Sequence, residues 1–523
     1  MLFTYLLPAI LGIISPAQTL VPGNNAIGAP EAAQRPESAE QEPSAALDSS
    51  EAQRPNVLFL FGDDQRADAI GALGNPGIQT PNLDSLVHKG VSFRRAYCLG
   101  SSTAAVCSPS RAMLHTGRAY HRIGTHSLDG EILLGELMGE AGYRTFGTGK
   151  WHNGRASFAR SFEEGHAVFF GGMSDHNQVP LVDMPERGTF ENERSSEAHS
   201  TPTIADAAVD WLGTSNGDAP WFCYVSFTAP HDPRDPPAEW LERERPPLPP
   251  NFLPQHPFDC GMLQIRDEKL AGWPRDKDVV RDQLREYYAL IEHLDHEVGR
   301  VLEAAESASN GRPTLIVYAA DHGLAMGSHG LLGKQNLYEH SMRAPMILAG
   351  AGLPEGQGLT ALTYLHDLFP TVLGLAGAAP AHALDGRDLR PLWEGRATGV
   401  RDSLYLSMQR TQRAVTDGRW KLIVYPQVHH SQLFDLAADP FEMVDLHGNP
   451  AFAHHALRLE QELERWRAEL GDTAPLRVED PKPLEIDLSN AKRKPDRFQP
   501  EWIREKYFPK PTSEPAKANA DKR

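Results

Sequence analysis

A cysteine and an arginine stand four residues apart in the segment Cys107-Ser108-Pro109-Ser110-Arg111, which follows a run of small and polar residues. Proline is well tolerated in the first turn of a helix, because its missing N–H has no partner there. A helix that begins at Cys107 places the arginine on the same face as the thiol. The helix N-terminus and a guanidinium both favour a thiolate, so the pattern predicts a nucleophilic cysteine. The simpler interpretation is a buried cysteine at the start of a helix.

Ionisable residues also follow four apolar runs, each typical of a strand that is buried on both faces. In parallel sheets covered by helices, ligands bind at the carboxyl edge, so these residues are expected to meet there. Three aspartates favour a hard cation such as Ca²⁺ or Mg²⁺, with a histidine as a softer ligand. Run by run, the residues are Asp63 and Asp64 after 56–61, Lys150 and His152 in the strand 143–152, His231 after 221–227, and Asp321 and His322 after 314–320.

Two lysines and an arginine complete a predicted anion site. Lys334 ends a glycine-rich loop at 327–334. Together with Lys150 and Arg111 it would form a cationic pocket for a tetrahedral anion. The two-residue alternation of a strand places Lys150 and His152 on one side. His152 and His231 are the candidates for proton transfer.

The chain around these residues has 523 residues and a net charge of −18, from 51 basic and 69 acidic side chains. This charge argues against a nucleic-acid partner. The pattern predicts an α/β fold at 56–400, with a large mixed, mostly parallel sheet sandwiched by helices. A smaller α+β subdomain of antiparallel strands packed with a helix is expected at 401–472, and 473–523 is expected to be a wrapping or disordered extension.

The N-terminus predicts export from the cytoplasm. Residues 1–19 resemble a signal peptide and 20–55 a disordered linker. No other apolar run approaches 18 residues, so we expect no membrane span in the mature chain and a periplasmic or secreted location. Four cysteines are too few for a disulfide scaffold, although Cys98, Cys223 and Cys260 leave one bridge open.

Three further expectations concern local structure. A helix is predicted at 130–142, and a long helix at 282–305 with Glu292, His293 and His296 on its surface. The Gly-, His- and acid-rich stretch 153–199 is expected to be a loop that forms part of a pocket wall.

Four sequence blocks together resemble the type I, formylglycine-dependent sulfatase family of the alkaline phosphatase superfamily, over residues 56 to about 470. Within this family, the sequence most resembles the bacterial secreted polysaccharide sulfatases. Each block alone is weak evidence, and their combination is specific. The blocks are Cys-x-Pro-x-Arg at 107–111 continued by Leu-His-Thr-Gly-Arg at 114–118, Gly-Thr-Gly-Lys-Trp-His at 147–152, Pro-His at 230–231, and Gly-Lys at 333–334.

The resemblance implies a role for each site residue. Cys107 would be oxidised to formylglycine by a formylglycine-generating or other maturing enzyme, and one hydroxyl of its gem-diol would attack sulfur to give a sulfo-enzyme intermediate. One Ca²⁺ would be held by Asp63, Asp64, Asp321, His322 and the formylglycine oxygen. Arg111 would hold the formylglycine, and Lys150 and Lys334 would bind sulfate oxygens. His231 would protonate the leaving alcohol, and His152 would take the proton that releases sulfate. Many family members have Asn where this chain has His322, which leaves Ca²⁺ and Mg²⁺ both open.

The implied reaction is hydrolysis of sulfate monoesters on an extracellular sulfated carbohydrate, such as an algal polysaccharide or a glycosaminoglycan fragment. Asp175 and His176 are expected to contact substrate hydroxyls or, alternatively, to stabilise their loop. Other readings of the sequence are a phosphonate or phosphodiester hydrolase of the same superfamily, and a non-catalytic carbohydrate-binding relative with an unmodified Cys107. A plain cysteine hydrolase is disfavoured, because the partner residues do not form a Cys–His–Asn set.

Overall fold

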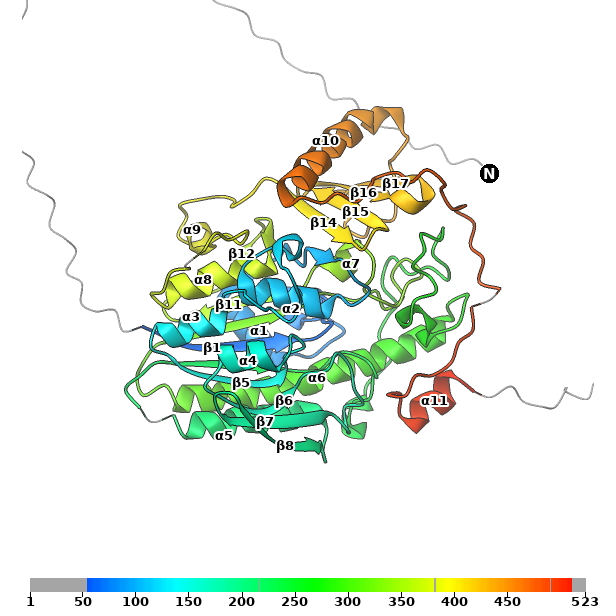
Figure 1. Cartoon of the computed structure of the whole chain (residues 1–523). Coiled ribbons are helices and arrows are strands. Elements are labelled where there is room, and N and C mark those ends of the chain that lie inside the picture. Colours follow the sequence, from blue (N-terminus) through cyan, green and yellow to red (C-terminus); the bar gives the residue numbers. More distant parts are fainter. Residues whose placement is uncertain (1–53, 216, 381, 490, 510–523) are drawn as a thin grey trace, which may run out of the picture. The chain divides into compact units, whose positions relative to one another are not determined.

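The computed structural model describes residues 54–215, 217–380, 382–489 and 491–509, and Figure 1 shows their helices and strands. The predicted signal peptide and the predicted linker up to residue 53 lie outside these residues, as does the chain after residue 509. Within the described part, no helix combines the length and the apolar character that crossing a membrane requires.

A ten-stranded mixed sheet organises the larger part of the chain. In order across the sheet, its strands are β12 (Gln357–Leu359), β2 (Gly90–Phe93), β11 (Met346–Gly350), β10 (Thr314–Ala320), β1 (Asn56–Gly62), β9 (Trp221–Ser226), β5 (Arg144–Lys150), β6 (Glu164–Phe169), β7 (Pro180–Glu186) and β8 (Thr189–Ser195). The central strands from β10 to β6 run parallel, and antiparallel pairings join β11 to β10 and β7 to β6. The four apolar runs chosen from the sequence are thus neighbours, in the order β10, β1, β9, β5.

Helices cover both faces of this sheet (Figure 1). One layer consists of α1 (Pro81–His88), α5 (Ser200–Gly213) and α6 (Lys277–Ser307), which share a core with Leu58 and Leu60 of β1. The other consists of α2 (Cys107–Thr116), α3 (Leu134–Glu140), α4 (Arg155–Ser161) and α8 (Leu368–Leu375), which share a core with Val57 and Phe59. Alternate β1 side chains enter opposite cores, which is why the run is apolar throughout. The predicted α/β sandwich is confirmed.

A second, mostly antiparallel sheet follows in the chain. Its strands, in spatial order, are β17 (His430–Asp435), β16 (Trp420–Tyr425), β15 (Gln412–Thr416), β14 (Leu404–Met408) and β4 (Gly100–Ser101). Helix α10 (Ala453–Leu470) packs on β15 and β16 and buries Leu459 and Leu463. Strand β4 belongs to the segment that leads into α2, so this sheet also supports the approach to Cys107. The small elements β3 (Ala96–Tyr97), β13 (Thr363–Tyr364) and α9 (Arg390–Trp393) lie in the segments that connect the two sheets, and α7 (Glu339–Met342) lies between β10 and β11 of the larger sheet.

The described part of the C-terminal extension returns to the larger sheet. It ends in α11 (Glu501–Tyr507), which buries Ile503 and Tyr507. The indole N–H of Trp502 donates to Asp235 at 2.8 Å, in the segment that follows β9. Of the two expected states of the extension, wrapping describes residues 491–509.

Three local predictions were wrong. Residues 153–199 hold α4, β6, β7 and β8 instead of a loop; β8 is a polar edge strand, so it lacks the apolar run of a central one. The helix expected at 130–142 covers Leu134–Glu140 only, and the Glu136 carboxylate accepts from the N–H of Leu133 just before it. His293 is not on the surface but on the buried side of α6, where its ring stacks on Trp240.

All four cysteines are free and buried, so the possible disulfide is absent.

Candidate active site

Helix α2 begins at Cys107, as the sequence predicts, and ends at Gly117 with φ of +66°. The Ser110 hydroxyl donates to the carbonyl oxygen of Asp321 at 2.6 Å. This contact fixes the first turn of α2 against the end of β10. Cys107 therefore lies at the carboxyl edge of the sheet.

Arg111 is fully buried one turn further along α2. Its Nη1 donates to the carbonyl oxygen of Lys150 at 2.8 Å and to the Ser226 hydroxyl at 2.7 Å. Its Nε lies 3.3 Å from Asp321, and its Nη2 lies 3.4 Å from Asp63. The guanidinium thus joins the ends of β5, β9, β10 and β1 beneath the thiol.

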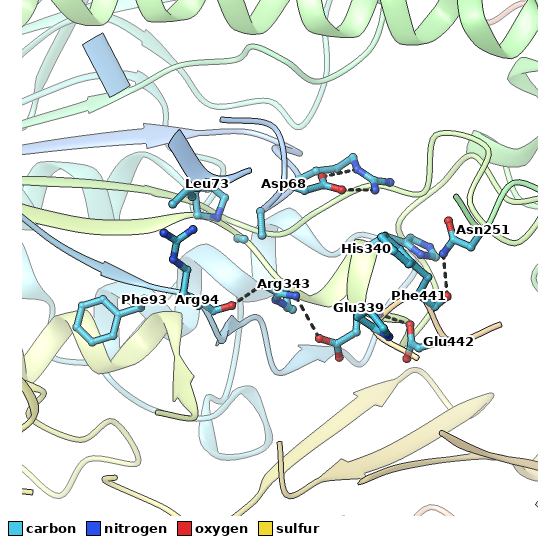
Figure 2. Close-up of a pocket in the computed structure, with 15 residues that line it drawn as sticks. Asp68, Leu73, Phe93, Arg94, Asn251, Glu339, His340, Arg343, Phe441 and Glu442 are labelled. Carbon is cyan, nitrogen blue, oxygen red and sulfur yellow. Dashed lines mark hydrogen bonds and ion pairs between the residues drawn. The ribbon is translucent and has the colours of Figure 1, made fainter. Parts of the chain in front are cut away.

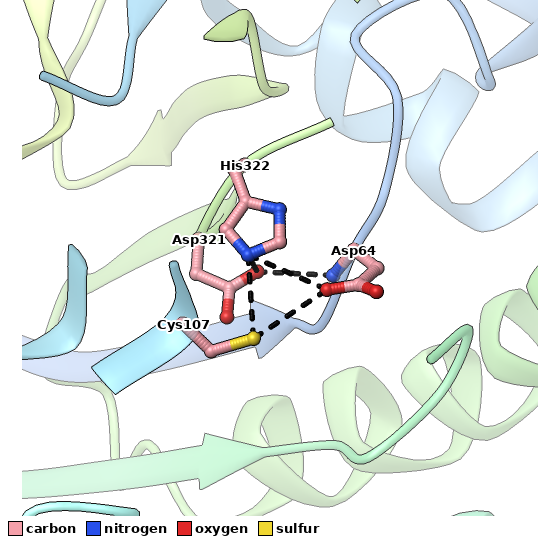
Figure 3. Close-up of side chains that lie close together, drawn as sticks. All are labelled: Asp64, Cys107, Asp321 and His322. Carbon is pink, nitrogen blue, oxygen red and sulfur yellow. Dashed lines mark hydrogen bonds and ion pairs between the residues drawn. The ribbon is translucent and has the colours of Figure 1, made fainter. Parts of the chain in front are cut away.

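Four potential metal ligands converge on one point, as Figure 3 shows for Asp64, Cys107, Asp321 and His322. All four are buried, and one ligand atom from each lies within 4.8 Å of the others. His322 Nε2 is 3.3 Å from Cys107 Sγ and 3.4 Å from Asp64 Oδ1. The Nδ1 of His322 lies 3.0 Å from the carbonyl oxygen of Gly323, so a proton on Nδ1 leaves a lone pair on Nε2 for a metal.

Asp63 lies beside this cluster and is held by cations. Lys150 Nζ is 2.5 Å from its Oδ2, while its Oδ1 has no hydrogen-bond donor among the described residues. Burial opposes ionisation of this carboxyl, but Lys150, His231 and Arg111 outweigh it and hold the pKa of Asp63 well below its usual range. Asp63 is therefore an anion whose Oδ1 lies 3.4 Å from Arg111 Nη2 and accepts no hydrogen bond from the described residues.

The charges of the buried site balance without a metal. Its three cations are Lys150, Lys334 and Arg111, and its three carboxylates are Asp63, Asp64 and Asp321. Burial raises the pKa of Asp321, and although His322 opposes this, the nearby carboxylates of Asp63 and Asp64 add to it. A divalent cation would reduce the repulsion among the three carboxylates and would give the site a net positive charge that suits an anionic substrate. The donor set therefore fits a divalent metal ion.

The unmodified thiol is not activated. Burial raises the pKa of Cys107 well above its usual value, although Lys150 and Lys334 act in the opposite direction. Burial outweighs the two lysines, so the first interpretation of the segment, a thiolate favoured by a helix N-terminus and Arg111, is not supported for the unmodified residue.

His231 faces the cluster from the segment after β9. Its Nε2 lies 3.7 Å from Asp64 Oδ2, and its Nδ1 lies 2.7 Å from the carbonyl oxygen of Asp232. With Nδ1 donating to this carbonyl, Nε2 is the nitrogen available to a substrate. The sequence correctly placed this histidine at the edge of the sheet.

His152 reaches the site differently from the prediction. Strand β5 ends at Lys150, and His152 has φ of +69°, so strand alternation does not relate the two side chains. Burial, aided by Lys150 and Arg111, lowers the pKa of His152 to about 2. The imidazole is therefore neutral in this site, and its protonated form is disfavoured.

His176 is fully engaged inside the protein. Its Nδ1 lies 2.9 Å from the Ser200 hydroxyl and 3.2 Å from that of Thr228, and its Nε2 lies 2.9 Å from the carbonyl oxygen of His231. Only 1% of the surface of His176 is exposed. Of the two expectations for His176, these contacts favour stabilisation of the site over contact with substrate. The neighbouring Asp175 lines a surface hollow instead.

Two groups that support the site escaped the sequence analysis. Ser226, which accepts from Arg111, is the single polar residue at the end of the apolar strand β9. Asp232 is buried and bound by Arg266 at 2.7 Å, 34 residues later in the chain. Ser226 could have been found as a polar residue in an apolar run, whereas nothing in the local sequence indicates that Asp232 supports the site.

A separate cavity of about 260 Å³ lies near the start of β11 (Figure 2). Its polar lining includes Asp68, Arg94, Glu339 and Arg343, and it contains none of the predicted site residues. Figure 2 shows the ion pair between Glu339 and Arg343 in the lining of this cavity. The predicted chemistry is therefore not located in this cavity.

Comparisons with known proteins agree with this arrangement. A family model described as Sulfatase matches residues 55–378, and one described as N-sulphoglucosamine sulphohydrolase, C-terminal, matches 327–469. An arylsulfatase from Clostridium perfringens is 27% identical over 75% of this chain and 90% of its own length. An ulvan-active sulfatase from Formosa agariphila is 26% identical over 80% and 82%.

A solved structure shares the fold. It is a protein in complex with its substrate D-glucosamine-2-N,6-O-disulfate, with a TM-score of 0.68, 22% identity and coverage of 82% of this chain and 100% of its own. The first family model alone spans more than half of the chain. The chain therefore belongs to the sulfatase family of the alkaline phosphatase superfamily, and it is a sulfuric ester hydrolase.

Proposed function

We propose that the chain hydrolyses sulfate monoesters of an extracellular sulfated carbohydrate and acts in the periplasm or outside the cell. The observation that carries this proposal is the convergence of Asp64, Asp321, His322 and Lys334 on Cys107 at the edge of a sulfatase-family sheet. The ulvan-active relative supports a polysaccharide substrate. Export rests on the signal-like sequence at 1–19.

The chain would need one covalent modification and one bound metal ion before it acts. Cys107, oxidised to formylglycine by a separate maturing enzyme, would supply a nucleophilic hydroxyl from its hydrated aldehyde. One Ca²⁺, held by Asp63, Asp64, Asp321, His322 and residue 107, would supply Lewis-acid stabilisation of the sulfate oxygens. The Oδ1 of Asp63 accepts no hydrogen bond from the described residues, and the Nε2 of His322 lies within 3.4 Å of Cys107 Sγ and Asp64 Oδ1, so both atoms suit this ligand set.

The chain's own cations would bind the sulfate. Lys150 and Lys334 both reach the centre of the site, where their nitrogens now pair with Asp63 and Asp64. With a metal ion on these carboxylates, the two ammonium groups would be available to bind sulfate oxygens. Arg111 contacts the ends of four strands and would hold residue 107 in place. Fixed charges of this kind stabilise negative charge as it develops in a transition state.

Two histidines would move protons. The Nε2 of His231 points toward Asp64 and would donate a proton to the leaving alcohol oxygen. His152 would accept a proton from residue 107 when sulfate leaves, the role that the resemblance to sulfatases implies. His176 holds the backbone of His231 and would act as a positioning residue. Asp175 remains the candidate for contact with substrate hydroxyls.

The experiment that tests the proposal compares matched sulfate and phosphate monoesters, and a phosphonate ester, of the same alcohol. The matured chain should release sulfate faster than phosphate, because a sulfate monoester carries one negative charge less. Faster turnover of the phosphate or phosphonate ester would overturn the proposal in favour of the superfamily alternative. Sugar binding without release of sulfate, with Cys107 unmodified, would favour a non-catalytic relative.

A further inference from the structure

We propose that the C-terminal extension forms a second substrate subsite, in which Arg497 binds a carboxylate or sulfate group on the sugar next to the one that loses sulfate. The subsite is the hollow between the loop 174–180 and residues 497–504, which we call the strap. This inference rests on the proposed function, because it assumes a saccharide at the site of Cys107.

The strap is fixed to the catalytic part of the chain. Arg493, just before it, donates to the carbonyl oxygens of Lys269 and Leu270 at 3.1 and 3.3 Å. Tyr507, just after it, donates to Glu286 at 2.6 Å. Between these anchors, the Trp502 indole donates to Asp235. A surface held at both ends and in the middle is sufficiently ordered to recognise a ligand.

Both walls of the hollow contact the segment that carries His231. On the strap side, Gln499 Nε2 lies 3.3 Å from the buried Asp232 carboxylate. On the loop side, Asp175 precedes His176, whose Nε2 lies 2.9 Å from the carbonyl oxygen of His231. These buried contacts connect both walls of the hollow to the backbone of the segment that carries His231.

The size of the hollow suits a sugar. Its volume is about 550 Å³, within the range of roughly 300–1,000 Å³ of small-ligand sites. Its lining is mostly polar side chains with one aromatic ring, a composition that matches a hydroxyl-rich ring. The lining includes Ser174, Asp175, Gln178, Arg497, Phe498 and Arg504, together with the exposed carboxylate of Glu501.

The two arginines have different tasks. Arg504 donates to the carbonyl oxygens of Gln499 and Arg497, at 2.6 and 3.2 Å, and so stabilises the strap. Arg497 is exposed, and its guanidinium lies 4.6 Å from the centre of the Phe498 ring. No carboxylate of the described residues lies within 4 Å of Arg497. Its fork of N–H groups is therefore available for a planar carboxylate or a sulfate.

Local charge is needed because the chain as a whole repels an anionic polysaccharide. The net charge is −18, so the overall field opposes binding. Asp175 has one oxygen bound by the N–H of Asn177 at 2.9 Å, and Gln178 lies beside it. These side chains suit the hydroxyl groups of the neighbouring sugar, while Arg497 suits its anionic group.

The test uses three disaccharides in which the same sulfated hexosamine is linked to a neutral hexose, a uronic acid or a sulfated hexose. Arg497→Ala should lower kcat/KM about 10- to 100-fold on the substrates with an anionic neighbour, as expected for a lost charge-assisted contact. It should change kcat/KM less than about twofold on the neutral disaccharide and on 4-nitrophenyl sulfate. Loss with only one anionic neighbour identifies carboxylate or sulfate as the group that is bound.

Two controls separate recognition from structure. Lys494→Ala removes a positive charge from the exposed surface just before the strap and should leave all four substrates unaffected. Arg497→Lys should recover part of the loss. Equal loss on all substrates, or no loss on any, would overturn the proposed subsite.

Binding gives a readout that does not need turnover. Calorimetry with Cys107→Ala, with and without Arg497→Ala, measures the affinity for the same disaccharides. A drop limited to those with an anionic neighbour supports the subsite even if the wild-type chain releases no sulfate, which would overturn the proposed function alone. Unchanged affinities would overturn the subsite.

Discussion

The Lys334 ammonium donates to both carboxylate oxygens of Asp64, at 2.7 and 2.8 Å, and lies 3.3 Å from the Sγ of Cys107. Burial lowers the pKa of Lys334, but the Asp64 carboxylate opposes it and holds that pKa well above its usual value, so this lysine is charged. One side chain therefore contacts both a predicted metal ligand and the predicted nucleophile position. A metal ion bound at Asp64 would release the ammonium toward the substrate.

We therefore predict that Lys334→Ala lowers kcat/KM for sulfate esters about 10²- to 10³-fold, a typical effect of removing one stabilising donor. The metal content should not fall, because Asp64 loses only a competitor for its oxygens. Steady-state kinetics and elemental analysis measure the two quantities. Lys89→Ala, at an exposed position after α1, is the charge-matched control. Activity of Lys334→Ala within twofold of wild type would contradict the assigned role.

The metal site gives a second prediction. Asp64→Asn should reduce the bound divalent metal per chain and abolish sulfate release, because it removes a central carboxylate of the cluster. Asp68→Asn is the matched control, because that side chain is 54% exposed and pairs with Arg66. Elemental analysis of both variants, together with calcium titration of the stripped proteins, checks this. Equal metal content in both variants would exclude Asp64 as a ligand.

His176 and Asp175 should behave differently although they are neighbours. His176→Ala removes the contact with the His231 carbonyl, so we predict a lower kcat on saccharide and aryl sulfates alike, with the smallest loss for the best leaving group. Asp175→Ala should raise KM on the saccharide and leave aryl sulfates nearly unchanged. The measurement is a kinetic series over aryl sulfates of increasing leaving-group pKa. A saccharide-specific loss in His176→Ala would instead indicate direct contact with substrate.

Buried neutral histidines should make the fold sensitive to acid. Burial, with smaller contributions from His296 and His176, lowers the pKa of His293 to about 4, whereas the unfolded value is about 6.5. Between these values the unfolded chain binds the additional proton, so the free energy of unfolding falls as the pH drops from about 6.5 to 4. The contribution of this residue is on the order of 1–3 kcal/mol.

The variant His293→Phe isolates this contribution. Phenylalanine keeps an aromatic ring against Trp240 and cannot bind a proton. Denaturant melts at pH 7 and pH 4.5 should show a smaller loss of unfolding free energy for the variant than for wild type. The same loss in both proteins would show that His293 does not contribute.

Much of the site could be predicted because it lies at strand ends. Asp63, Asp64, His231, Asp321 and His322 each follow an apolar run, and the covered parallel sheet brings these runs side by side. Local sequence was sufficient there, since burial on both faces leaves a continuous apolar pattern. Lys334 lies on a glycine-rich loop, so the sequence assigned it to the anion site by its charge, and the resemblance to sulfatases added its role as a sulfate ligand.

The remaining features depend on contacts that are distant in sequence. His152 was assigned to a strand, but the chain leaves β5 at Lys150 and turns through a positive φ. The burial of His176 depends on Ser200 and Thr228, and the position of Gln499 depends on Asp232, 267 residues away. No local pattern encodes such pairings, because they arise only when separate elements pack. The expectation of an activated thiolate was not supported for the same reason, because the burial that raises the pKa of Cys107 is a tertiary property.

The most direct test of the proposed nucleophile is the mass of the peptide that contains residue 107, taken from a chain produced together with a formylglycine-generating enzyme and shown to release sulfate. We predict a peptide lighter than the unmodified sequence, because the thiol is replaced by an aldehyde, and a rate of sulfate release proportional to the converted fraction. An unmodified Cys107 throughout a preparation that releases sulfate at full rate would contradict the formylglycine mechanism.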